Sequence, residues 1–244
     1  MMLCLDAGNS RLKYGLFGDG QWLVQGALNY AELKQLRARL PQPPQRIIIC
    51  NVAGPQVAAT LNDFAKELGL MPHWFASTAS ACGVQNGYAQ PTQLGVDRWA
   101  ALIGARGLHR GNAVVVMSGT ATTIDTLDAN GNFCGGVILP GLDLMRAALA
   151  KGTAGLPLAA GNFAALPRNT DDAISSGAIQ ATLGAIERIA TQAFVGSPDG
   201  NNLCLVSGGA ADVLLPHLKV PSRQVGNLVL EGLARYGQFG ATLN

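Results

Sequence analysis

The sequence predicts an α/β fold made of two similar halves, each a mixed sheet flanked by helices. The first observation is that three antiparallel-looking strands open the chain and alternating helices and strands follow them. The second is that strand, glycine turn, strand, tight turn, strand and helix recur in that order after residue 110. The third is the apolar run 46–52 (RIIICNV), which is typical of a strand buried on both faces of a parallel sheet. We therefore divide the chain into halves 1–110 and 111–244.

Apolar runs and turn residues define the elements of the first half. Strands are expected at 3–6, 12–17, 21–28, 46–52 and 73–75. Helices are expected at 30–40, with Asn29 as a cap, at 55–68 and at 94–108. The segment 77–93 is rich in Ser, Gly, Asn and Pro. A loop of this length in a compact domain is often functional.

The second half has the same kind of elements. Strands are expected at 113–117, 121–127, 133–139 and 203–206, and helices at 142–150, 170–193, 210–215 and 227–239. The segment 151–169 is irregular and rich in Gly, Ala and Pro, so it is a candidate mobile connection or lid.

Composition excludes several classes of protein. Hydrophobic residues make up 48% of the chain and charged residues 13%, enough for a sizeable core, and the net charge of +2 gives no basic footprint for nucleic acid. The five cysteines are dispersed and form no CxxC pair, which indicates reduced thiols. No signal peptide and no apolar segment long enough to cross a bilayer is found. The sequence predicts a cytoplasmic protein without nucleic-acid or membrane partners.

A glycine turn, 7–10 (AGNS), follows the first strand. Gly8 has no Cβ, so the backbone could bend there and approach a ligand closely. The free N–H groups of the turn could hold a phosphate. Asp6, at the end of the strand, is placed to bind Mg²⁺, and Lys13 adds a positive charge. A β-hairpin with an Asx-rich turn fits these residues equally well.

Two more small-residue turns follow strands, at 118–120 and 207–210. In the first, Thr120 and Thr122 could bind the other end of a polyphosphate, although threonines are also simply favoured in strands. In the second, Gly208 and Gly209 could accept an anion or let a nucleotide base lie close, although a plain glycine turn is the alternative. Three such turns, two of them in duplicated positions, favour nucleotide binding.

The segment Gly95-Val96-Asp97-Arg98 opens a predicted helix after the long polar loop. Asp97 could take a proton from an attacking hydroxyl group, and Arg98 could pair with a substrate carboxylate through its planar guanidinium. The alternative is an acidic residue stabilised by the helix dipole, followed by a solvated arginine. Asp125, within a predicted strand, could support Mg²⁺ through water or lie at a sheet edge.

Together these segments resemble the type III pantothenate kinase family. The segments that carry the resemblance are, in family order, 6–10 with Lys13, 86–88 (NGY), 95–98, 119–125 (GTATTID), 135–136 with 140–141, and 207–210. The resemblance implies two ribonuclease-H-like halves with a central cleft, as in the superfamily of actin and sugar kinases. It also implies ATP-dependent phosphorylation of pantothenate to 4'-phosphopantothenate, the first step of coenzyme A biosynthesis, usually by a homodimer.

The resemblance also implies roles for single residues. Asp97 would be the catalytic proton acceptor. Mg²⁺ would bind at Asp6 together with ATP. The implied ATP-binding residues are Asp6, Ala7, Gly8, Asn9, Ser10, Arg11, Leu12, Lys13 and Thr120. The implied pantothenate-binding residues are Tyr88, Gly95, Val96, Arg98 and Thr170.

One position departs from the family pattern. Met117 stands where the family often has an aspartate that helps to hold potassium or ammonium. A thioether is a poor ligand for a hard cation, so the sequence identifies no ligand for a monovalent cation. Two alternative functions remain. One is a kinase for another small hydroxylated acceptor on the same fold. The other is a non-catalytic nucleotide-binding regulatory protein, and Met117 is the only sequence feature that favours it.

Overall fold

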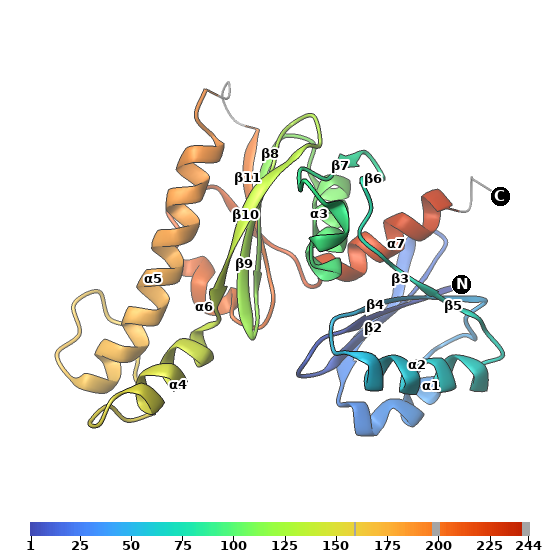
Figure 1. Cartoon of the computed structure of the whole chain (residues 1–244), viewed down its shortest axis with the longest axis horizontal. Coiled ribbons are helices and arrows are strands. Elements are labelled where there is room, and N and C mark those ends of the chain that lie inside the picture. Colours follow the sequence, from blue (N-terminus) through green and yellow to red (C-terminus); the bar gives the residue numbers. More distant parts are fainter. Residues whose placement is uncertain (159, 197–200, 241–244) are drawn as a thin grey trace. The chain divides into compact units, whose positions relative to one another are not determined.

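The computed structural model describes residues 1–158, 160–196 and 201–240 (Figure 1). The predicted segment 151–169 and the predicted half 111–244 each include positions that lie outside the described residues. The chain forms two compact units. Of the described residues, those in Met1–Leu108 and from Asn227 onward form unit 1, and those in His109–Gly226 form unit 2.

Unit 1 contains a five-stranded mixed sheet in the order β3-β2-β1-β4-β5. β1 pairs antiparallel with β2, and β2 with β3, whereas β4 runs parallel to β1 and β5 runs parallel to β4. The strands are β1 (Met2–Ala7), β2 (Leu12–Gly18), β3 (Gln21–Leu28), β4 (Arg46–Asn51) and β5 (Pro72–Trp74). The predicted parallel, doubly buried strand at 46–52 is thereby confirmed.

Helices and one short hairpin complete unit 1. They are η1 (Tyr30–Gln35), α1 (Leu36–Arg39), α2 (Pro55–Glu67), η2 (Pro91–Gln93), α3 (Val96–Leu108) and α7 (Leu228–Gly240), with the hairpin β6 (Ser80–Ala81) and β7 (Val84–Gln85). The single helix expected at 30–40 is wrong, because its first part is a 3₁₀ helix. Leu33 and Leu36 are both buried there, and three residues per turn place such a pair on one face.

Alternating side chains of β1 enter two different cores. Leu3, Leu5 and Ala7 belong to the cluster that contains Leu61 and Phe64 of α2. The other face meets α7, because a Cβ on Gly237 would lie 2.2 Å from the Met2 sulfur. Figure 1 shows α2 and α7 on opposite faces of this sheet. Since side chains alternate along a strand, Asp6 belongs to the same face as Met2.

Two glycines let α7 pack closely against α3. A Cβ on Gly104 would lie 2.4 Å from the backbone oxygen of Leu228, and one on Gly232 would lie 1.8 Å from that of Ala100. Only residues without a side chain allow the two backbones to approach so closely. The predicted division placed the helix 227–239 in the half 111–244, whereas α7 packs within unit 1.

Unit 2 repeats the sheet of unit 1. Its strand order is β10-β9-β8-β11-β12, with two antiparallel pairings followed by two parallel ones. The strands are β8 (Asn112–Ser118), β9 (Ala121–Leu127), β10 (Phe133–Pro140), β11 (Asn202–Ser207) and β12 (Ser222–Gln224). The predicted duplication is confirmed. The sequence did not indicate β12, which is only three residues long and carries no buried side chain.

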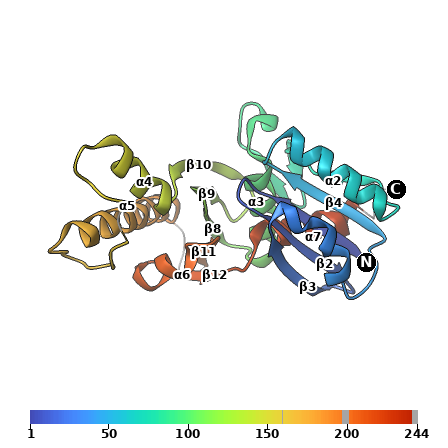
Figure 2. The same ribbon diagram turned by 90° about the horizontal axis from the view of Figure 1, so that it is seen from below.

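The helices of unit 2 are α4 (Leu142–Gly152), α5 (Thr170–Ala193), α6 (Ala211–Leu214) and η3 (Leu215–His217). α5 packs on the sheet through Ile179 and Leu183, which meet Val114 and Val116 of β8. Figures 1 and 2 both show α4 beside α5. Within the described residues, no helix is long and apolar enough to span a membrane.

Candidate functional site

Asp6 and Lys13 form an ion pair at the end of β1. The two residues are direct partners in the antiparallel register of β1 and β2, so their side chains lie on the same face of the sheet. Lys13 Nζ lies 3.5 Å from Asp6 Oδ2, and the Asp6 side chain is only 7% exposed. The structure therefore brings together the acidic and the basic residue that the first turn was predicted to supply.

A second carboxylate lies close enough to act on Asp6. The pKa of the Asp6 carboxyl is raised, chiefly by burial and further by the charge of Asp97. The charge of Lys13 and hydrogen bonding from Lys13 and Asn227 act in the opposite direction. The thiol of Cys50, on the neighbouring strand β4, has a pKa raised by burial and then by the charges of Asp6 and Asp97. Asp6 is the direct partner of Lys13 on β2 and of Cys50 on β4, and we call these three residues the Asp6 cluster. The charge of Asp97 acts on this cluster.

This cluster fits a divalent cation held together with phosphates. Asp6 supplies carboxylate oxygens, and the charge of Asp97 adds to the negative charge there, which Lys13 alone only partly offsets. The described residues contain no group of three or more His, Cys, Asp or Glu side chains that could hold a metal ion by themselves. Mg²⁺ is commonly bound by one or two carboxylates plus substrate phosphates, so the cluster matches that chemistry.

The turn after β1 is held by a residue that the sequence did not single out. Tyr30, in η1, donates a hydrogen bond from its hydroxyl to the backbone oxygen of Gly8 at 2.6 Å. Burial and the charge of Asp6 raise the pKa of Tyr30 to about 12. Asn9, Ser10 and Arg11 are exposed on this turn. Ala7 and Leu12 are fully buried, so their side chains serve the core.

The backbone conformation at position 8 does not require a glycine, although a bend that needs one was expected there. Its φ lies outside the left-handed region, and a Cβ there would lie 3.5 Å from the backbone oxygen of Arg11, an ordinary contact. The free space at Gly8 therefore lies outside the protein, where a ligand can approach.

Gly8→Ala is expected to change the free energy of unfolding by no more than about 0.5 kcal/mol. If a phosphate of ATP binds at this turn, as the family resemblance implies, the added methyl would occupy its space, and we expect KM for ATP to rise about tenfold, equivalent to about 1.4 kcal/mol. Thermal melting and initial-rate kinetics measure the two effects. A large loss of stability with an unchanged KM would contradict this account.

Asp97 lies in the first turn of α3. Its Oδ1 accepts a hydrogen bond from the backbone N–H of Arg98 at 2.8 Å. A Cβ on Gly95 would lie 2.9 Å from that same oxygen, so the glycine leaves room for the carboxylate. Val96 begins the helix and, like Asp97, is half-buried. The acidic residue predicted as proton acceptor thus has a defined position beside the Asp6 cluster.

Arg98 is buried rather than solvated. Only 5% of it is exposed, its Nη1 donates to the Tyr88 hydroxyl at 3.0 Å, and its guanidinium lies 5.8 Å from the centre of the Tyr88 ring. Asn86 shapes the loop, because its Oδ1 accepts from Tyr88 N and its Nδ2 donates to Pro91 O. The interpretation of Arg98 as a solvated residue is therefore wrong. A buried guanidinium is suited to bind a carboxylate.

The second glycine turn, 118–120 in unit 2, lies in close contact with the backbone at two other glycines. A Cβ on Gly208 would lie 2.3 Å from Ser118 O, and one on Gly141 would lie 2.0 Å from Gly119 O. The backbone N–H of Gly141 also donates to Thr120 O at 2.9 Å. Thr120 is exposed at this turn.

Thr122 does not fit the predicted contact with a polyphosphate. It is fully buried, and its hydroxyl lies 3.1 Å from that of Ser118 in a hydrogen bond. Met117 pairs in register with Thr123 and Ser207 and is half-buried. Asp125 is fully buried in β9, which is an interior strand of its sheet, so its placement at a sheet edge is wrong. Thr170 is exposed at the start of α5.

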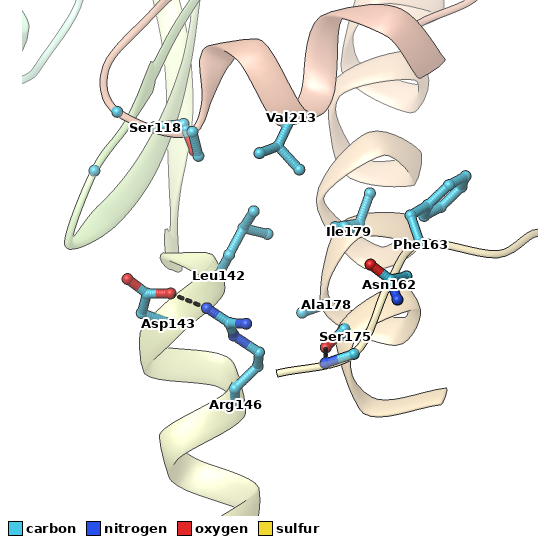
Figure 3. Close-up of a pocket in the computed structure, with 14 residues that line it drawn as sticks. Ser118, Leu142, Asp143, Arg146, Asn162, Phe163, Ser175, Ala178, Ile179 and Val213 are labelled. Carbon is cyan, nitrogen blue, oxygen red and sulfur yellow. Dashed lines mark hydrogen bonds and ion pairs between the residues drawn. The ribbon is translucent and has the colours of Figure 1, made fainter. Parts of the chain in front are cut away.

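Unit 2 contains a cavity of about 480 Å³ (Figure 3). The second and third glycine turns contribute Gly119, Gly209 and Ala210 to its wall. Phe163 lines it and packs on His217, with 4.0 Å between ring centres. Arg146 lines it and forms an ion pair with Asp143. The cavity therefore combines small residues, one aromatic ring and one ion pair.

Comparison with known proteins identifies the family. The family model of type III pantothenate kinases matches residues 2–192. The chain belongs to the type III pantothenate kinase family. The type III pantothenate kinase of Aromatoleum aromaticum is 49% identical over 236 residues, which cover 96% of each chain. That of Dechloromonas aromatica is 48% identical over 236 residues, which cover 96% of this chain and 97% of the relative. Membership of this kinase family implies use of ATP and a divalent metal.

Solved structures of low sequence identity share the fold of this chain. A putative Baf family transcriptional activator from Campylobacter jejuni has a TM-score of 0.63 at 21% identity, covering 98% of this chain and 99% of its own. A putative 2-dehydro-3-deoxygalactonokinase from Sinorhizobium meliloti has a TM-score of 0.61 at 16% identity, with the same coverage. Together with the duplicated sheets, these likenesses confirm the predicted actin and sugar-kinase fold.

Proposed function

We propose that this chain transfers a phosphoryl group from ATP to the hydroxyl of pantothenate, giving 4'-phosphopantothenate in the first step of coenzyme A biosynthesis. The observation that carries this proposal is the start of α3, where Asp97 and the buried Arg98 are adjacent. Pantothenate has both a hydroxyl that must lose a proton and a carboxylate that a guanidinium can bind. The two side chains match these two groups.

On the nucleotide side, we propose that residues 6–13 and Thr120 bind ATP. The backbone N–H groups of the exposed turn would contact phosphate oxygens, and Lys13 would offset their charge. Asp6 would hold Mg²⁺, which neutralises negative charge on the phosphates during transfer. The burial of Asp6 and its ion pair with Lys13 support this assignment.

We further propose that the nucleoside of ATP occupies the cavity of unit 2. Gly119, Gly209 and Ala210 carry little or no side chain, so a base could approach the backbone there. Phe163, backed by His217, offers a flat apolar wall for a planar ring.

On the acceptor side, Asp97 would accept the proton of the attacking hydroxyl, and Arg98 would bind the carboxylate. Tyr88 would hold Arg98 in place and line the acceptor site, as its hydrogen bond to Arg98 supports. Gly95 and Val96 would contribute backbone at the start of α3. For Thr170 the support is the family resemblance alone.

The test is phosphorylation of pantothenate by purified protein with ATP and Mg²⁺, with and without potassium or ammonium. We expect turnover. If potassium or ammonium stimulates turnover, a monovalent-cation site exists despite Met117. If neither ion changes turnover, that site is lost. Turnover with another hydroxylated acceptor only would support the alternative kinase. Nucleotide binding without any turnover would support the regulatory protein.

We also propose that two copies of the chain associate through unit 2. The outer strand β10 exposes Ile138 to 63%, and α4, which buries none of its residues, exposes Leu144 to 49%. Exposed apolar side chains of this kind are typical of an interface. Light scattering measures the mass in solution. The cytoplasmic location stays a prediction, in keeping with the free cysteines.

A further inference from the structure

We propose that Ser175 and Ser176 of α5 are positioning residues for nucleotide binding, because they fix the wall of the unit 2 cavity that carries Phe163. The inference rests on the proposed placement of the nucleoside of ATP in that cavity. The wall is formed by residues 161–164, which we call the strap and which lie between α4 and α5 in the chain. Three consecutive strap residues, 161–163, line the cavity.

Side chains of α5 hold the backbone of the strap. Ser175 Oγ accepts a hydrogen bond from Gly161 N at 3.0 Å, and Ser176 Oγ accepts one from Ala164 N at 2.9 Å. Both serines are buried, with 4% and 2% of their surface exposed, so water does not compete for these hydrogen bonds. The two serines therefore tie the strap to α5 on both sides of Phe163.

The residue between these two attachment points is also bound to α5. Asp172 Oδ1 accepts a hydrogen bond from Asn162 N at 2.7 Å, and Ser176 Oγ donates to Asn162 O at 3.4 Å. A Cβ on Gly161 would lie 2.2 Å from the backbone of Asp171, so only a glycine allows the strap to come this close to α5. The strap thus lies directly against the first turns of the helix.

Residues beyond the strap pack less closely. Leu158 is 70% exposed and Leu166 is 87% exposed, so these apolar side chains do not anchor the chain on either side. The stretch that α5 fixes therefore coincides with the stretch that lines the cavity. A loop that becomes ordered only when a ligand binds loses conformational entropy at that moment, which weakens binding. A strap that is fixed beforehand avoids this loss.

Phe163 is the side chain that the strap presents to a ligand. Its ring packs on His217 of η3, with 4.0 Å between ring centres. Figure 3 shows Phe163 on the α5 side of the cavity and Arg146 of α4 on the opposite side. A planar base stacks favourably on an aromatic ring. The two serines should therefore affect binding of the nucleoside and leave the acceptor side of the reaction unchanged.

The test uses Ser175→Ala and Ser176→Ala, singly and together. Each substitution removes one hydroxyl and adds no group, so the strap loses an acceptor while α5 can persist. We expect the single variants to bind ATP with Mg²⁺ about threefold more weakly and the double variant about tenfold, measured by calorimetry. Hydrogen exchange in a peptide that covers the strap should become faster. KM for ATP should rise, while kcat and KM for pantothenate stay unchanged.

Thr182→Val is the matched control. Thr182 is fully buried in the same helix, and its hydroxyl donates to Ala178 O within α5 at 2.9 Å. Valine keeps the branched shape without the hydroxyl, so this variant loses a buried hydroxyl of α5 that does not hold the strap. Its affinity for ATP should stay normal.

Phe163→Ala locates the effect in the strap. It removes the stacking surface, so we expect ATP to bind about tenfold more weakly. Adding Ser175→Ala and Ser176→Ala to Phe163→Ala should weaken binding no further, because the serines act through Phe163.

Two results would overturn the role of the serines while the nucleoside placement stands. One is normal ATP binding by the double serine variant together with weak binding by Phe163→Ala. The other is an equal loss of affinity in Thr182→Val and in the double serine variant. Normal ATP binding by Phe163→Ala would overturn the nucleoside placement at this wall, and this inference with it. Turnover of pantothenate tests phosphoryl transfer independently of all three results.

Discussion

Asp97→Asn is expected to reduce turnover of pantothenate by about 10²- to 10⁴-fold, the usual contribution of a positioned general base. The amide has the same shape, and its oxygen can still accept from Arg98 N, so the fold of α3 should persist. Removing the charge of Asp97 lowers the pKa of Asp6, which favours ionised Asp6, so binding of ADP with Mg²⁺ should remain. Steady-state kinetics and calorimetry measure the two effects.

Asp63→Asn is the control for this substitution. Asp63 is exposed on α2 and pairs with Lys66 across one helical turn, so its loss should change neither rate nor binding. Near-normal turnover by Asp97→Asn would remove Asp97 as the proton acceptor. Loss of nucleotide binding together with turnover would assign Asp97 to the metal instead.

Gly208→Ala is expected to destabilise the protein by about 3 to 5 kcal/mol, at the upper end of the effects of single substitutions. Gly208 has a φ of 102°, which residues with a Cβ rarely adopt. The new Cβ would also lie 2.3 Å from the backbone oxygen of Ser118 on a buried strand, and backbone cannot move away as a flexible side chain can.

Gly209→Ala separates this effect from a general effect of the turn. A Cβ at Gly209 would meet no atom within 4 Å, so its unfolding free energy should change by less than about 0.5 kcal/mol. Urea unfolding measures both variants. Equal stability of Gly208→Ala and Gly209→Ala would show that the turn can relax, contrary to the packing described.

The two duplicated halves use their glycines in different ways. In unit 2, Gly141 and Gly208 are required because their backbones press on the turn at Ser118 and Gly119. In unit 1, an alanine at Gly8 would meet only an ordinary contact. Packing therefore does not require the glycine of the first turn, whereas it does require those around the second turn.

Much of the fold could be predicted from the sequence because strands and helices follow from local patterns. The limits of β3, β9 and α5 coincide with those expected, and the repeated order of elements indicated the duplicated sheets. The sequence indicated that Lys13 adds a positive charge near Asp6, and the register of β1 and β2 makes the two residues direct partners. The predicted helix at 30–40 failed because α and 3₁₀ spacing are similar over so few residues.

Tertiary structure alone decided the rest of the candidate site. Burial of Arg98 against Tyr88 depends on how the loop 77–93 folds around Asn86. Thr122 is buried because β9 is an interior strand, and its hydroxyl finds a hydrogen-bond partner in Ser118. The sequence by itself determined which residue types are available and which strands carry them. Their partners follow from packing between distant segments, because no local periodicity records which backbones can approach closely enough to touch.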